Sequence, residues 1–212
     1  LKKNKKKIII LKNKKKTNKG SYDQINSYYR GFLKSKGKYI FFLDSDDYFK
    51  KNKINILIKY FEKNKNINVV FDLPILKYSK INIKKKFKQK KFILSSWPRF
   101  PPQSCISVKR TFMKELFHNL NVKKFDTIWF DFRIACYCFL KEGTLIVLKK
   151  YLTYYRKHNN SASTKFKTFS KNWWYRRNQA HDFLSYLSNK LKKKDKFTID
   201  KFLTKMVILF NE

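Results

Sequence analysis

The sequence predicts an α/β domain with a mostly parallel central sheet flanked by helices, followed by a helical C-terminal tail. Apolar stretches of strand length alternate with segments of helical spacing, the pattern typical of such a sheet. The run 38–43 is almost continuously apolar, as in a strand covered on both faces. A basic, aromatic stretch with helical patterning begins near Phe166. We therefore expect one domain over residues 1–165 and a tail over residues 166–212.

The first half of the chain contains two expected helices and three expected strands. Three consecutive isoleucines favour a short buried strand at 7–11. Apolar groups at helical spacing predict helices over 21–35 and 52–64, and Gly37 is placed to end the first of them. The run 38–43 is expected to be a central parallel strand, and a further strand is expected at 68–71.

The second half is less regular at its beginning. Residues 72–103 hold all four prolines, and we expect a hairpin and a substrate loop there. A helix is predicted over 122–140 and a strand over 144–151.

The charge is strongly positive, with 52 Lys and Arg against 14 Asp and Glu and a formal net charge of +38. Such a charge is typical of nucleic-acid binding. However, the cations are 45 Lys and 7 Arg, whereas nucleic-acid binders favour the bidentate fork of Arg. The abundant residue types have codons rich in A and T, so we interpret the charge mainly as background composition.

Composition excludes several other classes of protein. A hydrophobic content of 42% excludes a wholly disordered polybasic tail. No run of about 18 apolar residues is present, so we expect no membrane-spanning helix. The three Cys, at 105, 136 and 138, form no C-x-x-C pair, which argues against a disulfide framework or a zinc site.

An acidic cluster, Asp44, Asp46 and Asp47, directly follows the 38–43 strand. Carboxylates so close together repel one another unless a cation neutralises them, and Mg²⁺ is typically held by one or two carboxylates plus substrate phosphates. In open α/β sheets, ligands bind outside the carboxyl ends of strands. The cluster therefore predicts a metal–diphosphate site. The alternative is an Asx-rich turn that caps the next helix.

Three of the four glycines lie just upstream of the cluster, at positions 20, 31 and 37. In a chain so poor in glycine, this bias indicates close backbone packing or a required positive φ. Helix punctuation explains Gly37 but not Gly31, which lies inside a helical pattern.

The segment from Gly31 to Ile40, Gly-Phe-Leu-Lys-Ser-Lys-Gly-Lys-Tyr-Ile, leads into Leu43-Asp-Ser-Asp-Asp47 and resembles glycosyltransferase family 2. The catalytic domain of that family has the GT-A fold, and the resemblance covers roughly residues 7–165. It implies that Asp46 is the principal carboxylate for Mn²⁺ or Mg²⁺ and that Asp44 approaches the metal or the nucleotide ribose. It also implies that Gly31 belongs to the donor-binding segment. Asp47 is expected to cap a helix or to support the carboxylates that bind the metal.

The chain departs from the family pattern in two places. Tyr29 stands where the family often has Asn. Family members normally begin with a strand and loop that contact the base, followed by a V-D-D-G-S-like segment, and neither precedes Lys7. We therefore expect an N-terminally truncated member.

The segment Phe125–Arg133 is similar to the family's acceptor-side helix start, which presents an acidic residue. An inverting transfer needs a base to deprotonate the acceptor hydroxyl. The resemblance implies Asp131 as this base, with Asp126 as the alternative. A carboxylate in a first helical turn is also favoured by the helix dipole alone.

The segment Tyr151–Ser163 resembles the family's Y-R-x-H-x-x-S-x-S sequence. The resemblance implies that Arg156 and His158 neutralise charge on the departing nucleoside diphosphate, as fixed cations do in phosphate chemistry. Taken alone, His158 is also compatible with a surface histidine in a basic loop.

Two aromatic segments remain. The loop 96–105 contains Trp97 and three prolines and is a candidate acceptor platform, or ordinary hydrophobic loop packing. Trp173 and Trp174 lie beside cations, as at a lipid headgroup interface, or pack the tail onto the core.

These patterns together predict a metal-dependent, inverting glycosyltransferase acting on a polysaccharide or lipid-linked glycan. The expected partners are a nucleotide-diphosphate sugar, the glycan acceptor and a peripheral membrane contact, with nucleic acid not expected. The expected location is cytoplasmic, at the inner face of the plasma membrane. The alternatives are a nucleic-acid-binding basic protein, a sugar-phosphate nucleotidyltransferase, which normally needs a Gly-rich phosphate loop, and an inactive truncated homologue.

Overall fold

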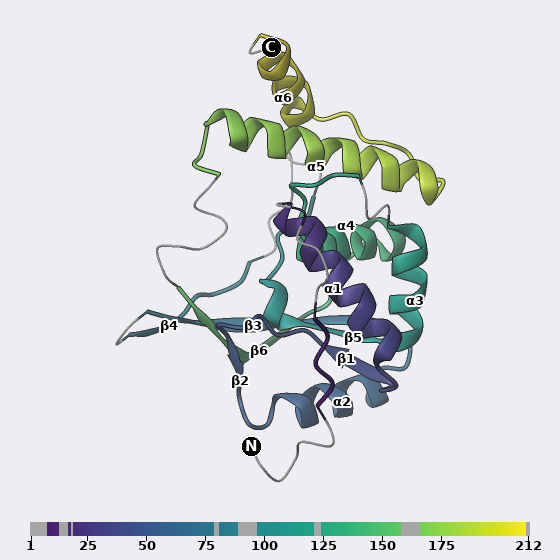
Figure 1. The fold of residues 1–212 in the computed structure, drawn as a ribbon, viewed down its shortest axis with the longest axis vertical. Coiled ribbons are helices and arrows are strands. Elements are labelled where there is room, and N and C mark those ends of the chain that lie inside the picture. The colour runs from purple at the N-terminus through teal and green to yellow at the C-terminus, as the bar shows by residue number, and fades with distance from the viewer. Residues whose placement is uncertain are drawn as a thin grey trace.

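The computed structural model describes residues 8–12, 17, 19–78, 81–88, 97–120, 124–157 and 166–210. Its elements in chain order are α1 (Gly20–Lys34), β1 (Tyr39–Phe41), β2 (Tyr48–Phe49), α2 (Lys53–Lys63), β3 (Val69–Lys77), β4 (Asn82–Lys84), a 3-10 turn (Gln103–Cys105), β5 (Ile106–Lys109), α3 (Arg110–Asn119), α4 (Phe130–Glu142), β6 (Val147–Arg156), α5 (Lys171–Lys190) and α6 (Ile199–Leu209). In Figure 1 a sheet crosses the middle, with α2 below it and α1, α3 and α4 above it. α5 lies above these helices, and α6 lies farthest from the sheet.

The sheet is mixed, with the strand order β1-β5-β3-β6-β2 and β4 paired to β3. Among the described strands, β3 and β6 form the one parallel pair, and the other four pairings are antiparallel. The prediction of a mostly parallel sheet is therefore wrong. The prediction of a central parallel strand at 38–43 is also wrong, because β1 lies at one end of the strand order and is antiparallel to β5.

The mixed sheet arises because β5 inserts between two strands that run in the same direction. β1 and β3 are connected through α2, and both pair antiparallel with β5, with Tyr39 opposite Lys109 and Val69 opposite Val108. Helix–strand alternation thus correctly predicts the common direction of β1 and β3. It does not predict that a later strand separates them.

The buried core lies on both faces of β3. Val70 points toward α2 and packs in a cluster with Leu57, Phe61 and Leu152. Val69 and Phe71 lie on the opposite face, in the larger cluster that includes α1, α3, α4 and α5. Alternate residues of β3 therefore serve two cores, as expected for a strand covered on both sides.

Local patterns predict several elements correctly. The helices predicted over 21–35 and 52–64 are α1 and α2, and the hairpin expected within 72–103 is β3 with β4. The helix predicted over 122–140 begins only at Phe130, because the preceding segment is an irregular turn with Phe125 at φ +66°.

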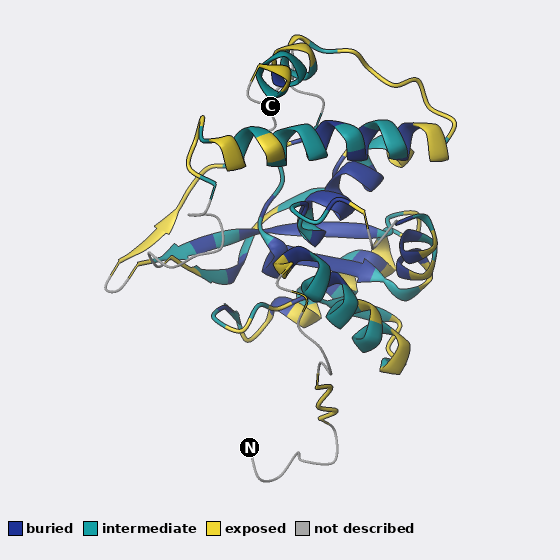
Figure 2. Ribbon diagram, turned by 45° about the horizontal axis from the view of Figure 1, so that its top comes forward, coloured by how far each residue is buried: buried dark blue, intermediate teal, exposed yellow. Residues whose placement is uncertain are grey.

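The strand predicted at 7–11 is not formed in the part that the structure describes. Ile8, Ile9 and Ile10 are 55%, 68% and 80% exposed and have no strand partner among the described residues. They lie in the extended segment that leads away from the body of the molecule in Figure 2. Lys7 is outside the described residues.

The tail helices differ in how they join the core. α5 buries Ala180, Phe183, Leu184 and Leu187 in the main hydrophobic cluster. α6 packs on α5 and contributes no residue to that cluster. Within the described ranges, none of the helices combines the length and apolar character that a bilayer-spanning segment requires.

Candidate active site

The three aspartates of the acidic cluster lie in the short connection between β1 and β2. The backbone N–H of Asp47 donates to the carbonyl oxygen of Asp44 over 3.1 Å, which closes a tight turn. The carboxylates therefore emerge together where β1 ends.

Asp44 is half-buried and is fixed from two sides. The hydroxyl of Tyr28, on α1, donates to Asp44 Oδ1 over 3.0 Å, and the backbone N–H of Asp44 donates to Ser104 Oγ over 2.9 Å. The pKa of Asp44 is raised to about 6, mainly by burial; the Tyr28 hydrogen bond lowers it, and the charges of Asp47, Asp131 and Asp46 raise it. The Asp44 carboxyl is thus poised to change its charge just below neutral pH.

Asp47 ties the acidic turn to β6. Its Oδ1 accepts a hydrogen bond from the backbone N–H of Arg156 over 2.9 Å, and the residue is 6% exposed. Burial raises the pKa of Asp47, against the N–H of Arg156. Asp47 does not cap α2, because α2 begins at Lys53 with Asn52 in the N-cap position.

Asp131 lies in the first turn of α4, where its Oδ1 accepts a hydrogen bond from the N–H of Phe132 over 2.8 Å. Burial raises the pKa of Asp131, and Arg176 on α5 lowers it. The Asp131 charge in turn raises the pKa values of Asp44 and Tyr28. The predicted base is therefore within electrostatic range of Asp44 and Tyr28.

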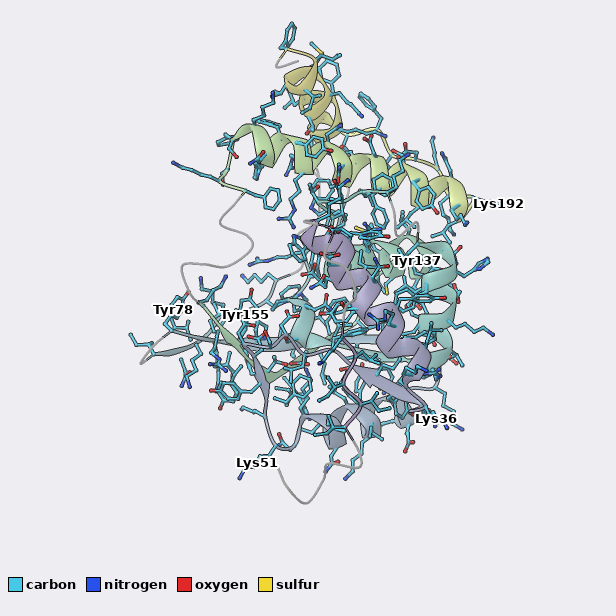
Figure 3. All side chains as sticks on the ribbon, in the orientation of Figure 1. Lys36, Lys51, Tyr78, Tyr137, Tyr155 and Lys192 are labelled. Atoms are coloured by element: carbon cyan, nitrogen blue, oxygen red, sulfur yellow. The ribbon has the colours of Figure 1, made fainter. Side chains whose placement is uncertain are left out.

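Tyr155 lies among all four of these carboxylates. Burial raises its pKa to about 12, and the charges of Asp47, Asp131, Asp44 and Asp46 act in the same direction. Figure 3 shows Tyr155 on β6, near the junction with β2. Its phenol hydroxyl is a further polar group at the place where β1, β6 and α4 converge.

A buried ion pair between α2 and β3 is connected to the acidic turn through Ser104. Lys53 of α2 and Asp72 of β3 are fully buried, with Lys53 Nζ 2.7 Å from Asp72 Oδ2. Lys53 also donates to the carbonyl oxygen of Ser104 and to Thr153 Oγ1, each over 2.7 Å. Because the Ser104 hydroxyl receives the Asp44 N–H, this network reaches the acidic turn directly.

Arg133 stabilises the turn that precedes α4, the helix that carries Asp131. Its buried guanidinium donates to the carbonyl oxygens of Ile128 and Lys124 over 3.0 Å and of Phe125 over 2.7 Å. These bonds satisfy the backbone of the turn that precedes α4, and they fix where α4 begins. Burial lowers the pKa of Arg133 to about 10.

The acidic cluster fits a hard divalent cation in its chemistry but is not a preformed cage. Its donors are carboxylate oxygens, and Asp47 Oδ2 is buried with no hydrogen-bond partner among the described residues. In the same part of the chain, no three His, Cys, Asp or Glu side chains gather as a ready-made metal site. This arrangement suits Mg²⁺ or Mn²⁺ held by one or two carboxylates, with the remaining ligands supplied by a diphosphate.

The other predicted residues differ in where they lie. The side chain of Arg156 is exposed at the end of β6, with its guanidinium 5.9 Å from the centre of the Tyr48 ring. His158 lies outside the described residues. Gly31 lies within α1, where an added Cβ would meet nothing within 4 Å, so neither close packing nor a positive φ explains it.

Asp126 is held by other partners. Its Oδ1 accepts from Gln179 Nε2 over 2.7 Å, and its Oδ2 lies 3.1 Å from Lys19 Nζ. The Gln179 hydrogen bond, followed by Lys19, lowers the pKa of Asp126. Its carboxylate influences none of the shifted pKa values in the acidic cluster.

A cavity of about 280 Å³ lies between α4 and the start of α5, and its lining includes Phe132, the residue after Asp131, but not Asp131 itself. Phe132 and Arg176 line it, and so do Trp97, from the predicted platform loop, and Trp173, from the tail. Arg177 lies between the two indoles, 4.9 Å from the Trp97 ring and 4.8 Å from the Trp173 ring. A larger cavity of about 1320 Å³, between α1 and α3, has no acidic-cluster residue in its lining.

Four polar residues of the site have no role predicted from the sequence: Tyr28, Ser104, Tyr155 and Arg176. Tyr155 lies inside the segment 151–163 that resembles the family, so the segment was predicted to belong to the site, but no role was predicted for Tyr155. Tyr28 and Ser104 reach the site through contacts across 16 and 60 residues, for which a single sequence holds no local pattern.

Comparisons with known proteins give the family of the chain. The sequence pattern of the family described as Glycosyl transferase family 2 matches residues 1–120, which include the acidic cluster. A search of curated proteins finds no match. Among solved structures, the chain is similar to S. aureus TarS 1-349 in complex with UDP-GlcNAc, with 10% identity and a TM-score of 0.46. That similarity covers 76% of this chain and 49% of the TarS chain, so the chain spans about half the length of that protein.

Proposed function

The chain belongs to glycosyl transferase family 2, and from this premise we propose that it is a metal-dependent, inverting glycosyltransferase. It transfers a sugar from a nucleotide-diphosphate donor to a hydroxyl of a polysaccharide or a lipid-linked glycan. We base the proposal on the electrostatic interaction of Asp131 with the acidic cluster. The Asp131 charge acts on Asp44, and all four carboxylates act on Tyr155.

In this proposal the acidic cluster receives the donor diphosphate. Asp44 and Asp46 bind Mn²⁺ or Mg²⁺, and Asp47 holds the turn in place through the backbone N–H of Arg156. The cation, when bound, neutralises the diphosphate oxygens and so stabilises the leaving group. The exposed Arg156 guanidinium adds a fixed positive charge there, and His158 is proposed to assist it.

Asp131 acts as the general base. Its raised pKa, caused by burial, makes it a better proton acceptor than an exposed aspartate. Arg176 opposes the shift and favours the ionised form that can accept the acceptor's proton. The cavity lined by Phe132 and Arg176, with its indole rings and guanidinium groups, is the proposed site for the glycan acceptor.

The test compares Asp131→Asn with Asp126→Asn. Because the base is lost only in the first variant, we expect transfer to fall about 10²- to 10⁴-fold in Asp131→Asn and to persist in Asp126→Asn. Both variants should bind the nucleoside diphosphate with unchanged affinity, measured by calorimetry with Mn²⁺ and a panel of UDP, GDP, CDP and ADP. Retained turnover in Asp131→Asn would reject it as the base.

A second arm tests the metal assignment with Asp46→Ala. Removing this carboxylate should abolish the Mn²⁺-dependent part of nucleoside diphosphate binding and leave binding without metal unchanged. The control is Asp23→Ala, which removes a carboxylate of α1 that bonds to Thr17. Equal affinity of wild type and Asp46→Ala in Mn²⁺ would rule out the metal role of Asp46.

A further inference from the structure

The faces of α6 are reversed relative to those of an ordinary surface helix. Such a helix normally buries its apolar stripe and exposes its polar side. In α6 the charged side chains of Asp200, Lys201 and Lys205 contact α5, and the hydroxyl of the buried Thr204 donates to the carbonyl oxygen of Asp200 within α6. The apolar side chains of Ile199, Phe202, Leu203 and Leu209 are exposed, whereas those of Met206, Val207 and Ile208 are partly buried.

The contacts with α5 fix this orientation. Arg177 Nε donates to Asp200 Oδ1 over 2.6 Å, and Lys205 Nζ donates to Asp182 Oδ1 over 2.8 Å. Thr204 is completely buried between them. α6 therefore cannot turn its apolar stripe inward without breaking charged contacts, one of which involves the half-buried Asp200.

The outward stripe lies at the start of α6. Ile199, Phe202 and Leu203 stand at positions i, i+3 and i+4, which share one helix face. The exposed apolar residues of this stripe and its two flanks are Phe197 (74%), Ile199 (59%), Phe202 (49%), Leu203 (51%), Leu209 (68%) and Phe210 (81%). Both ribbon views place α6 as the outermost layer, on the far side of α5 from the sheet (Figures 1 and 2).

Positive charge precedes the stripe along the chain. The end of α5 and the connection to α6 expose five lysines: Lys190, Lys192, Lys193, Lys194 and Lys196. Figure 3 shows Lys192 at the outer end of α5, where this connection begins. Asp195 is the one acidic residue of the connection, and its carboxylate is 2.7 Å from Lys201 Nζ, so it does not neutralise the five exposed lysines.

We propose that the outer face of α6 and the adjoining lysines dock on an anionic lipid bilayer. An amphipathic helix lying in the interface buries its apolar face at the boundary of headgroups and acyl chains, while nearby lysines bind the anionic headgroups. A bilayer matches both features at once, because it offers apolar depth and negative charge over a wide flat surface. The proposal does not depend on the chemistry of the acidic cluster.

The first test is co-sedimentation with vesicles of phosphatidylcholine alone or of equal parts phosphatidylcholine and phosphatidylglycerol. The wild-type chain should bind the phosphatidylglycerol vesicles, and the double variant Phe202→Ser, Leu203→Ser should bind them at least tenfold more weakly, equivalent to about 1.4 kcal/mol. The matched control is Leu33→Ser, Ile54→Ser, on α1 and α2, because these side chains are 57% and 44% exposed. This control should bind like the wild type.

The second test addresses charge. Lys193→Gln, Lys194→Gln should weaken binding to the phosphatidylglycerol vesicles and reduce its dependence on salt. The control, Lys51→Gln, Lys65→Gln, removes two exposed lysines near α2 and should have a much smaller effect. Equal losses in the two pairs would show general attraction by the net charge and would overturn the docking surface.

Two further measurements test whether the stripe enters lipid and whether it instead binds a second copy of the chain. Phe210→Trp gives a probe on the stripe whose fluorescence should be quenched by brominated lipid more than that of the wild type. Sedimentation velocity without lipid tests a second copy of the chain as the occupant. A dimer that dissociates in Phe202→Ser, Leu203→Ser, or no additional quenching at Trp in place of Phe210, would overturn the proposal.

Discussion

Asp44 lies half-buried among other carboxylates, so its ionised form is disfavoured in the folded protein. Its folded pKa, about 6, lies above the ordinary value of 3.8. Folding is therefore opposed by this group once pH rises above the unfolded pKa, and the full cost is present above about pH 6. A residue that destabilises the free protein in this way is typical of a binding site for a cation.

Asp44→Asn should therefore raise the melting temperature at neutral pH. The amide keeps an oxygen to accept the Tyr28 hydroxyl but carries no charge. The gain should grow as pH rises from about 4 to about 6 and then remain constant. Thermal unfolding across this pH range, without metal or nucleotide, measures it.

Asp126→Asn provides a control of opposite sign. The folded pKa of Asp126 lies below the ordinary value because of Gln179 and Lys19. Its carboxylate therefore contributes stability above the unfolded pKa, which is lost as pH falls, and the amide variant should melt lower at neutral pH. A shift of the same sign in both variants would contradict the charge explanation for Asp44.

At the scale of the elements, the buried pair of Lys53 and Asp72 joins α2 to the sheet. Burial raises the pKa of Asp72, against the ion pair and hydrogen bond with Lys53. Removing one member leaves the other charge buried without compensation, which typically costs several times more than removing both.

Lys53→Met should accordingly destabilise the protein by about 3–5 kcal/mol in urea unfolding. The double variant Lys53→Met, Asp72→Leu should recover most of that loss, because no buried charge remains. Lys59→Met, an exposed substitution on the same helix, should cost less than about 0.5 kcal/mol. Additive effects of Lys53→Met and Asp72→Leu would exclude this coupling.

The elements also show which parts of the fold a single sequence encodes locally. α2 has an apolar stripe, Leu57 and Phe61, that predicts both the helix and its buried face. The partner of β1 is different, because β5 is 65 residues later and contributes only four residues, Ile106–Lys109. Such a pairing is determined by tertiary packing, so the strand order could not be read from 38–43 alone. The same holds for the site: the three aspartates were found by their clustering, whereas Tyr28 was not.

At the scale of the whole molecule, the net charge of +38 dominates. Like charges spread over a compact body repel one another, and this repulsion opposes folding. Dissolved salt screens it, with a Debye length of about 10 Å at about 0.1 M.

We therefore expect the melting temperature to rise when sodium chloride is raised from low concentration to about 0.15 M. The rise should be smaller after several exposed lysines are replaced by Gln, for example Lys192, Lys193 and Lys194, because less repulsion is left to screen. Differential scanning calorimetry at pH 7 measures both. A melting temperature that falls with salt would indicate that attractive ion pairs, not repulsion, dominate the long-range electrostatics.

The two anchors of the acidic turn also determine the order in which the site is completed during synthesis. All three aspartates are synthesised before their anchors, because Ser104 follows Asp44 and Arg156 follows Asp47 in the chain. A nascent chain that ends within β6, before Arg156, thus carries every carboxylate of the proposed site, Asp131 included, but lacks the backbone group that holds Asp47. The geometry that distinguishes a metal–diphosphate site from a mere run of aspartates is a product of the last strand of the sheet.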